Sequence, residues 1–188
     1  MATPRAHRIE PQRAALVVVD VQARLAPHVM GAEGIERRCR ALVRGAQVLQ
    51  IPVFLTEHCP EALGATLPAI RGLVAESAVI AKRHFSAMDE AALRLALKES
   101  GRNQILVAGM EAHVCVMQTT LGLLQADYSC WLATDAVGSR RQEDRQAAIE
   151  RLRDAGATLA STEMALFEWL KHADHPAFRT IFSLVKEY

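Results

Sequence analysis

Short runs of β-branched and other apolar residues alternate along the chain with longer stretches whose apolar residues recur at helical spacing. The short runs predict strands at 15–21, 53–56, 78–82, 104–109, 129–134 and 158–160. The longer stretches predict helices at about 33–50, 88–99, 113–125, 140–155 and 162–170, and a last helix after Pro176. The first run reads AALVVVDV without polar alternation, which is typical of a strand buried on both faces of a parallel sheet.

This alternation of strands and helices predicts an α/β fold. Right-handed βαβ units would give a three-layer, doubly wound sandwich with a six-stranded parallel sheet. No repeat or linker interrupts the pattern, so we expect residues 1–188 to form a single domain. Ligands of such sheets bind beyond the carboxyl ends of the strands, where the strand order reverses. Residues that end strands are therefore the candidates for function.

Composition narrows the classes of partner. The 22 basic and 21 acidic residues nearly cancel, which argues against a nucleic-acid partner. No apolar run approaches the ~20 residues that cross a bilayer, and the N-terminal MATPRAHRIEPQR lacks the apolar region of a signal peptide. The four cysteines show no CxxC pair, as in a reducing compartment. We expect a cytoplasmic protein that acts on a small molecule and has no membrane partner.

Two predicted strands end in charged residues. Asp20 closes the first strand within VVVDVQ, and Lys82 closes the third within AVIAKRHF. Asp20 has an alternative role as a helix cap or turn residue, and Lys82 as a solvated strand end. If the ammonium is instead partly buried, it needs a carboxylate partner to stay charged.

Cys115 follows the fourth strand, in the predicted first turn of the next helix. A cysteine is often only a small buried apolar residue. At a helix N-terminus, however, free N–H groups and the helix dipole favour a thiolate, so we expect a lowered pKa there. The same free amides are able to bind a developing oxyanion. If the three strand ends meet, Asp20 is placed to take the proton of Cys115 while Lys82 holds the carboxylate.

Four segments stand out along the chain: VVVDVQ, AKRHFSAM, VAGMEAHVCVMQTTLGLL and ATDAVGSR. They resemble the isochorismatase-like cysteine hydrolase superfamily, which includes nicotinamidases and N-carbamoylsarcosine amidohydrolase. The third is the most specific, because a glycine, five residues and then Cys-Val between strand and helix resembles the family's nucleophile region. Together with the TEHCPEALGAT loop, the resemblance is greatest to the small isochorismatase-domain-containing group.

The resemblance implies a catalytic triad of Asp20, Lys82 and Cys115. It also implies a cis peptide bond at Met110–Glu111 and an oxyanion hole made by the backbone amides of Glu111 and Cys115. The implied reaction is hydrolysis of a small amide or carbamoyl compound through a thioester on the cysteine. Relatives usually assemble, so it further implies a homo-oligomer, a dimer or larger.

We expect no cofactor and no metal ion. Glu57 and His58 are adjacent, so in a continuing strand their side chains point to opposite faces, and no second histidine follows at ligand spacing. Residues predicted to bind substrate are placed near the strand ends, and are Gln22, Glu57, His84 and Phe85. His84 and His113 have the alternative of purely local hydrogen bonds. Ser139 and Arg140 are interpreted as a helix N-cap and a first-turn residue.

Two other functions compete with the amidohydrolase. The reaction that gives the superfamily its name cleaves an enol ether and does not require a cysteine, so Cys115 favours carbonyl chemistry without ruling out an ether substrate. A catalytically idle member would instead be a redox-responsive or interaction protein. The last predicted helix, with Phe178, Ile181, Phe182 and Val185 on one side, either packs on the sheet or meets another subunit.

Overall fold

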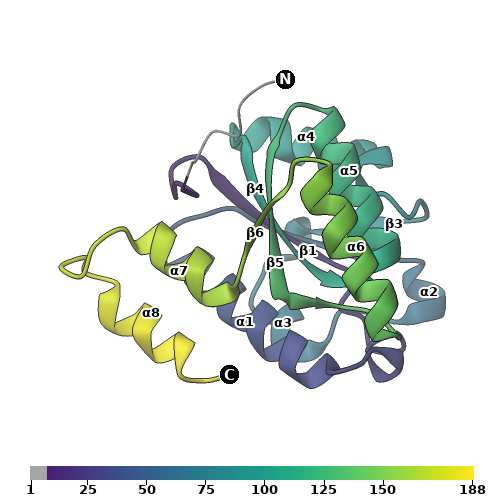
Figure 1. Ribbon diagram of the computed structural model, residues 1–188, viewed down its shortest axis with the longest axis horizontal. Helices are drawn as coiled ribbons and strands as arrows, with labels where there is room; N and C mark the ends of the chain where they lie inside the picture. Colours follow the sequence, from purple (N-terminus) through teal and green to yellow (C-terminus); the bar gives the residue numbers. More distant parts are fainter. Residues whose placement is uncertain (1–7) are drawn as a thin grey trace.

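The computed structural model describes residues 8–188 and contains a six-stranded parallel sheet in the order β3-β2-β1-β4-β5-β6 (Figure 1). The strands are β1 (Ala14–Val19), β2 (Val53–His58), β3 (Val79–Lys82), β4 (Gln104–Met110), β5 (Ser129–Gly138) and β6 (Thr158–Ala160). The predicted fold class is confirmed. Every residue of β1 and β4 is buried, as their unbroken apolar sequences require of central strands.

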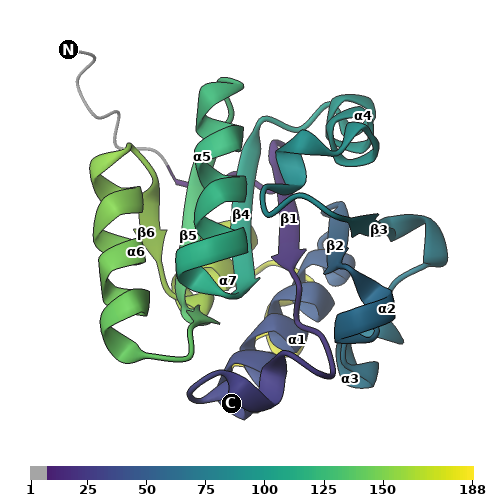
Figure 2. The ribbon, with the colours of Figure 1, turned by 90° about the vertical axis from the view of Figure 1, so that its right-hand side faces the viewer.

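Helices cover both faces of the sheet (Figure 2). They are α1 (Ala32–Val48), α2 (Pro60–Leu63), α3 (Pro68–Arg71), α4 (Ala91–Ser100), α5 (Met117–Gln125), α6 (Gln142–Asp154), α7 (Thr162–Leu170) and α8 (Phe178–Val185). One apolar core includes buried residues of α1, α3, α7 and α8 on one side of the sheet, with α8 packed on α1 and α7, and a second core forms beneath α4, α5 and α6. Within residues 8–188, no helix combines the length and apolar character needed to span a membrane.

The strand order reverses beside β1. The chain passes outward from β1 to β2 and β3, and then returns to place β4 on the other side of β1. Opposite Val19, the last residue of β1, lies Gly109 with φ +120°. A Cβ atom at Gly109 would lie 2.0 Å from the carbonyl oxygen of Val19, so only glycine allows this approach. This tight approach of β4 to β1 lies next to Asp20.

The fifth strand is longer than the sequence predicts. It continues past residue 134 to Gly138, with a register shift against β4 between Val107 and Gly109. Helix α6 therefore begins at Gln142 with Arg141 as its N-cap. The predicted cap role of Ser139 and the first-turn role of Arg140 are wrong, because both residues lie in the loop before the helix.

The last helix packs on the molecule's own core. Ile181 and Leu184 of α8 are buried against it, and Phe178 and Val185 pack there in part. Phe182 points outward and is 42% exposed, with the ammonium of Lys186 4.2 Å from its ring centroid. Helix α8 contacts chiefly α1 and α7 rather than the strands, so most of its apolar side chains pack on the chain's own helices and not directly on the sheet.

Candidate active site

Asp20 and Lys82 form a buried ion pair at the carboxyl edge of the sheet. Lys82 Nζ lies 2.7 Å from Asp20 Oδ2, and neither side chain is exposed. The hydroxyl of Thr56, in β2 between the two charged strands, donates a 2.6 Å hydrogen bond to Asp20 Oδ1. Asp20 has φ +50°, a left-handed conformation that aspartate tolerates better than most residues and that turns the chain at the end of β1.

The ammonium of Lys82 has two further partners in the segment that follows β3. Nζ donates to the carbonyl oxygens of His84 and Phe85, each at 3.2 Å. The carboxylate of Glu90 holds this segment, because Oε1 accepts hydrogen bonds from the Arg83 amide and from the amide and ring Nδ1 of His84. These bonds lower the pKa of Glu90 to about 2. The chain therefore supplies Lys82 with three oxygen partners.

Cys115 lies beside this ion pair and is buried. It belongs to a π-helical turn, Ala112–Val116, that joins β4 to α5. Burial raises the pKa of its thiol to about 12, and the negative charge of Asp20 adds to this, while the positive charge of Lys82 opposes it. The expectation of a lowered pKa is wrong, because the loss of hydration outweighs any effect of the helix end. The resting form of Cys115 is a thiol.

The two residues predicted to supply oxyanion amides belong to one compact turn. The peptide bond between Met110 and Glu111 is cis. The carbonyl of Glu111 accepts hydrogen bonds from the amides of Val114 and Val116, at 3.1 and 3.2 Å. Because Cys115 lies between these two donors, the turn fixes its backbone relative to Glu111.

Two of the predicted substrate-binding side chains are already engaged. Gln22 donates from Nε2 to the carbonyls of His58 and Gly64 and accepts the His58 amide at Oε1, so it ties the end of β1 to the segment after β2. The carboxylate of Glu57 accepts the Thr66 amide at 2.7 Å. Neither geometry supports a substrate contact, and we assign both side chains a structural role.

Glu57 also faces the wrong side of the sheet. The neighbouring positions Thr56 and His58 share the face on which Lys82 lies, and His58 is the register partner of Lys82. Side chains alternate along a strand, so Glu57 points to the opposite face, where Arg71 of α3 lies 3.8 Å away.

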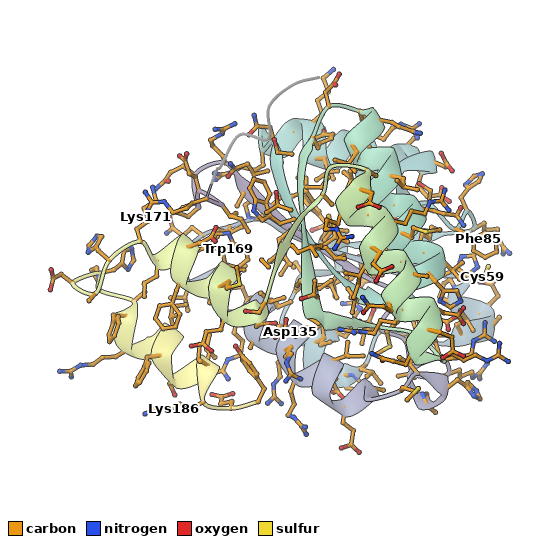
Figure 3. All side chains as sticks on the ribbon, in the orientation of Figure 1. Cys59, Phe85, Asp135, Trp169, Lys171 and Lys186 are labelled. Atoms are coloured by element: carbon orange, nitrogen blue, oxygen red, sulfur yellow. The ribbon has the colours of Figure 1, made fainter. Side chains whose placement is uncertain are left out.

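His58 and Thr56 are neighbours of the ion pair that the sequence analysis missed. The ring centroid of His58 lies 5.2 Å from that of Phe85, which is 51% exposed. Burial and the charge of Lys82 lower the pKa of His58, so its imidazole is neutral at pH 7. Figure 3 shows Phe85 near Cys59 at one margin of the molecule. Thr56 and His58 are two residues apart along β2, so their side chains share one face of the sheet, and this spacing was the signal that could have identified both.

The remaining histidines near the site make local bonds. The ring of His84 is exposed and binds Glu90, and His113 Nδ1 lies 2.9 Å from the hydroxyl of Ser139. Substrate contact by Phe85 or His84 stays a prediction. Among residues 8–188, no three His, Cys, Asp or Glu side chains are placed to hold a metal ion together.

Comparison with known proteins gives the family. Residues 14–164 match the model of the isochorismatase domain. The mouse isochorismatase domain-containing protein 2A is 33% identical over 192 residues, which cover 100% of this chain and 90% of that protein.

Two solved structures share the fold. One, described as the MAR1 ribonuclease of Caenorhabditis elegans, is 33% identical with a TM-score of 0.90. The alignment covers 96% of this chain and 93% of the ribonuclease chain. The other, the Escherichia coli YcaC gene product, is described as an octameric hydrolase of unknown specificity. It is 26% identical with a TM-score of 0.90, and the alignment covers 97% of this chain and 92% of the YcaC chain. With the matched domain, these similarities place the chain in the isochorismatase family, with the family's hydrolase fold.

Proposed function

We propose that this chain is a cysteine hydrolase that cleaves a small amide or carbamoyl compound without a metal ion. The observation that carries the proposal is the fully buried Asp20–Lys82 pair beside the thiol of Cys115. Charges are costly to bury, so a buried cluster of titratable groups indicates a functional site. This cluster lies where the strand order reverses, which is where parallel sheets of this kind bind their ligands. A nucleophile, a base and a group that orients the base are the parts an acyl transfer requires.

The reaction begins with the thiol in its protonated form. Asp20 takes the proton from Cys115 as the sulfur attacks the carbonyl carbon, and the carbonyl oxygen becomes an oxyanion. Lys82 orients Asp20 through the 2.7 Å ion pair before this step and supports the negative charge on sulfur during it. The raised pKa of Cys115 makes this base essential, because few thiolates exist at neutral pH without it.

The intermediate then collapses to a thioester. The amides of Glu111 and Cys115 hold the oxyanion, and removing one such donor costs about 3–4 kcal/mol in other acyl-transfer enzymes. Asp20 returns its proton to the departing amine as the C–N bond breaks. The carboxylate then takes a proton from water, whose oxygen attacks the thioester, and the carboxylic acid leaves as the thiol is restored.

The same thiol argues against the idle, redox-responsive alternative. Redox-sensing cysteines are exposed and have a low pKa, since the thiolate is the species that oxidants attack. Cys115 is buried, and its pKa is raised to about 12. The enol-ether alternative needs no cysteine, so it does not explain why Cys115 lies beside Asp20.

We also propose that the chain acts as a homo-oligomer. The E. coli neighbour is described as octameric. The outward-facing Phe182 in α8 gives this chain an apolar side chain available for a contact between subunits.

The test combines ammonia release with detection of the acyl-enzyme. A panel of small primary amides and carbamoyl compounds is screened with the purified chain, and adducts on Cys115 are sought by mass spectrometry. Replacing Cys115 by Ala lowers turnover more than about a thousandfold and removes the adduct, because no other group forms the thioester. Cys59→Ser is the matched control, since Cys59 is a partly exposed thiol with no part in the mechanism.

Two results would contradict the proposal. One is turnover that survives in the folded Cys115→Ala variant, with unchanged circular dichroism and urea midpoint. The other is cleavage of RNA, included because of the name of the C. elegans neighbour, at equal rates by this variant and the unaltered chain.

A further inference from the structure

The loop between β5 and α6 holds the turn that carries Cys115. Arg140 Nε donates a 3.0 Å hydrogen bond to Glu111 Oε1, and the backbone amide of Arg140 donates to the same oxygen at 3.3 Å. The preceding residue, Ser139, places its hydroxyl 2.9 Å from His113 Nδ1. Two consecutive loop residues thus contact the first and third residues of the segment 111–115.

The Glu111–Arg140 pair is asymmetric in its burial. The side chain of Arg140 is 61% exposed, whereas that of Glu111 is 8% exposed. An exposed ion pair contributes little, but a buried carboxylate that loses its partner keeps the cost of desolvation. Glu111 is therefore the constrained member, and any movement of the turn that separates it from Arg140 is disfavoured.

The backbone of Glu111 is constrained at the same time. Its carbonyl accepts the amides of Val114 and Val116, so its side chain is bound to the neighbouring loop while its main chain closes the turn. His113 adds a second link, since its Nε2 lies 4.0 Å from Asp144 in the first turn of α6. These contacts tie the segment between β4 and Cys115 to the start of α6.

We propose that Arg140 is a positioning residue for the oxyanion hole. Through Glu111 it holds the turn so that the amides of Glu111 and Cys115 face the oxygen of the reacting carbonyl, and Ser139 assists through His113. The inference rests on the proposed function, because it concerns the same reaction. An oxyanion hole is effective only when its donors are oriented beforehand, and Arg140 does this without touching substrate.

The experiment compares two reactions of Cys115. With p-nitrophenyl acetate, Asp20 takes the thiol proton as sulfur attacks the acyl carbon, an oxyanion forms, and p-nitrophenolate leaves with the bonding electrons. With iodoacetamide, the thiol likewise gives up its proton as sulfur displaces iodide from a saturated carbon, and no oxyanion forms. We expect Arg140→Ala to slow acylation by roughly tenfold or more while leaving alkylation within about twofold, because only acylation uses the oriented amides.

Three variants sharpen the comparison. Arg141→Ala removes a neighbouring exposed arginine and leaves both rates unchanged. Arg140→Lys keeps the positive charge and restores part of the acylation rate. In a Glu111→Ala background, which retains the backbone amide, adding Arg140→Ala slows acylation no further, since the two side chains act as one unit.

Normal acylation in Arg140→Ala would overturn the inference, and so would equal slowing of acylation and alkylation. The second result indicates a displaced sulfur or a loosened fold. Failure of the proposed function gives a different result, because acylation would then persist in Cys115→Ala whatever residue occupies position 140. Counting the acyl groups on Cys115 by mass spectrometry separates its reaction from those of other nucleophiles.

Discussion

Asp20 and Lys82 carry opposite charges into a region that is closed to water. Each buried ion costs several kcal/mol to desolvate, so the pair is a poor way to stabilise a fold. Thr56 and the carbonyls of His84 and Phe85 complete its hydrogen bonding. We infer that the pair is kept for its chemistry, as an oriented base next to the thiol of Cys115.

The thiol itself gives a prediction about pH. Since the pKa of Cys115 is about 12, its alkylation by iodoacetamide should rise about tenfold per pH unit from pH 8 to 11 and show no plateau. Peptide mass spectrometry measures this rate, with the partly exposed Cys59 as an internal reference. A plateau below pH 9 would show that Cys115 rests as a thiolate.

The same raised pKa links this residue to stability. Folding favours the protonated thiol, so Cys115 contributes no pH dependence below the ordinary thiol pKa of 9.0. Above pH 9 the unfolded thiol ionises while the folded one does not, so stability falls as the pH rises toward 12. Cys115→Ala should make this alkaline loss shallower in urea titrations.

At the scale of elements, the site depends on how closely β4 approaches β1. Val19, which pairs with Gly109, directly precedes Asp20, and β4 leads through Met110 into the turn that carries Cys115. Because a Cβ at Gly109 would collide with the backbone of Val19, its glycine sets the spacing of the two strands. The position of the base relative to the nucleophile thus depends on a residue that takes no part in the reaction.

Gly109→Ala therefore disturbs both the fold and the reaction. The methyl group meets backbone at a φ that alanine disfavours, and we expect a loss of at least about 2 kcal/mol in the free energy of unfolding. Gly101→Ala is the matched control: Gly101 also has a positive φ, at +66°, but nothing lies within 4 Å of its added Cβ. The free energy of unfolding of that control, measured by urea titration, should fall by about 1 kcal/mol. Equal losses in the two variants would contradict the role given to Gly109.

Sequence periodicity was enough to predict the sheet and which strand ends meet. Parallel strands bring their carboxyl ends to one edge, so Asp20 and Lys82 were correctly expected near one another. Details within a strand were harder. The prediction ended β2 at Thr56, whereas two more residues extend it and place His58 opposite Lys82.

Contacts between loops were beyond sequence reasoning. The hydrogen bond between Arg140 and Glu111 joins two segments whose approach depends on where β5 ends. The apolar pattern predicts an end at residue 134, but β5 continues for four more residues, from 135 to 138. The error for Cys115 has another origin. The predicted helix start at about residue 113 is a π-helical turn, Ala112–Val116, and α5 begins only at Met117. Burial, which decides the pKa, depends on the packing of the whole sheet.

At the scale of the whole molecule, the sheet supports two cores and one functional edge. Helices cover both faces of the sheet (Figure 2). The buried charges of Asp20 and Lys82 lie at the carboxyl ends of β1 and β3. The helix farthest along the chain, α8, adds buried Ile181 and Leu184 to one core and presents Phe182 outward.

The proposed assembly makes a prediction at this scale. Sedimentation of the purified chain should give a mass that is a multiple of 20.6 kDa. The physical reason is that an exposed aromatic side chain gains by leaving water when it meets another subunit. Dilution should shift the mass only at low concentration, and a species of 20.6 kDa at every concentration would contradict the assembly.

The wide separation of Asp20, Lys82 and Cys115 along the chain has a consequence for biosynthesis. The aspartate leaves the ribosome first and the cysteine long after it, and the central strands pair only once both have emerged. A nascent or truncated polypeptide therefore exposes an ordinary thiol with no neighbouring base. The proposed triad can therefore assemble only after the central strands β1 and β4 have paired.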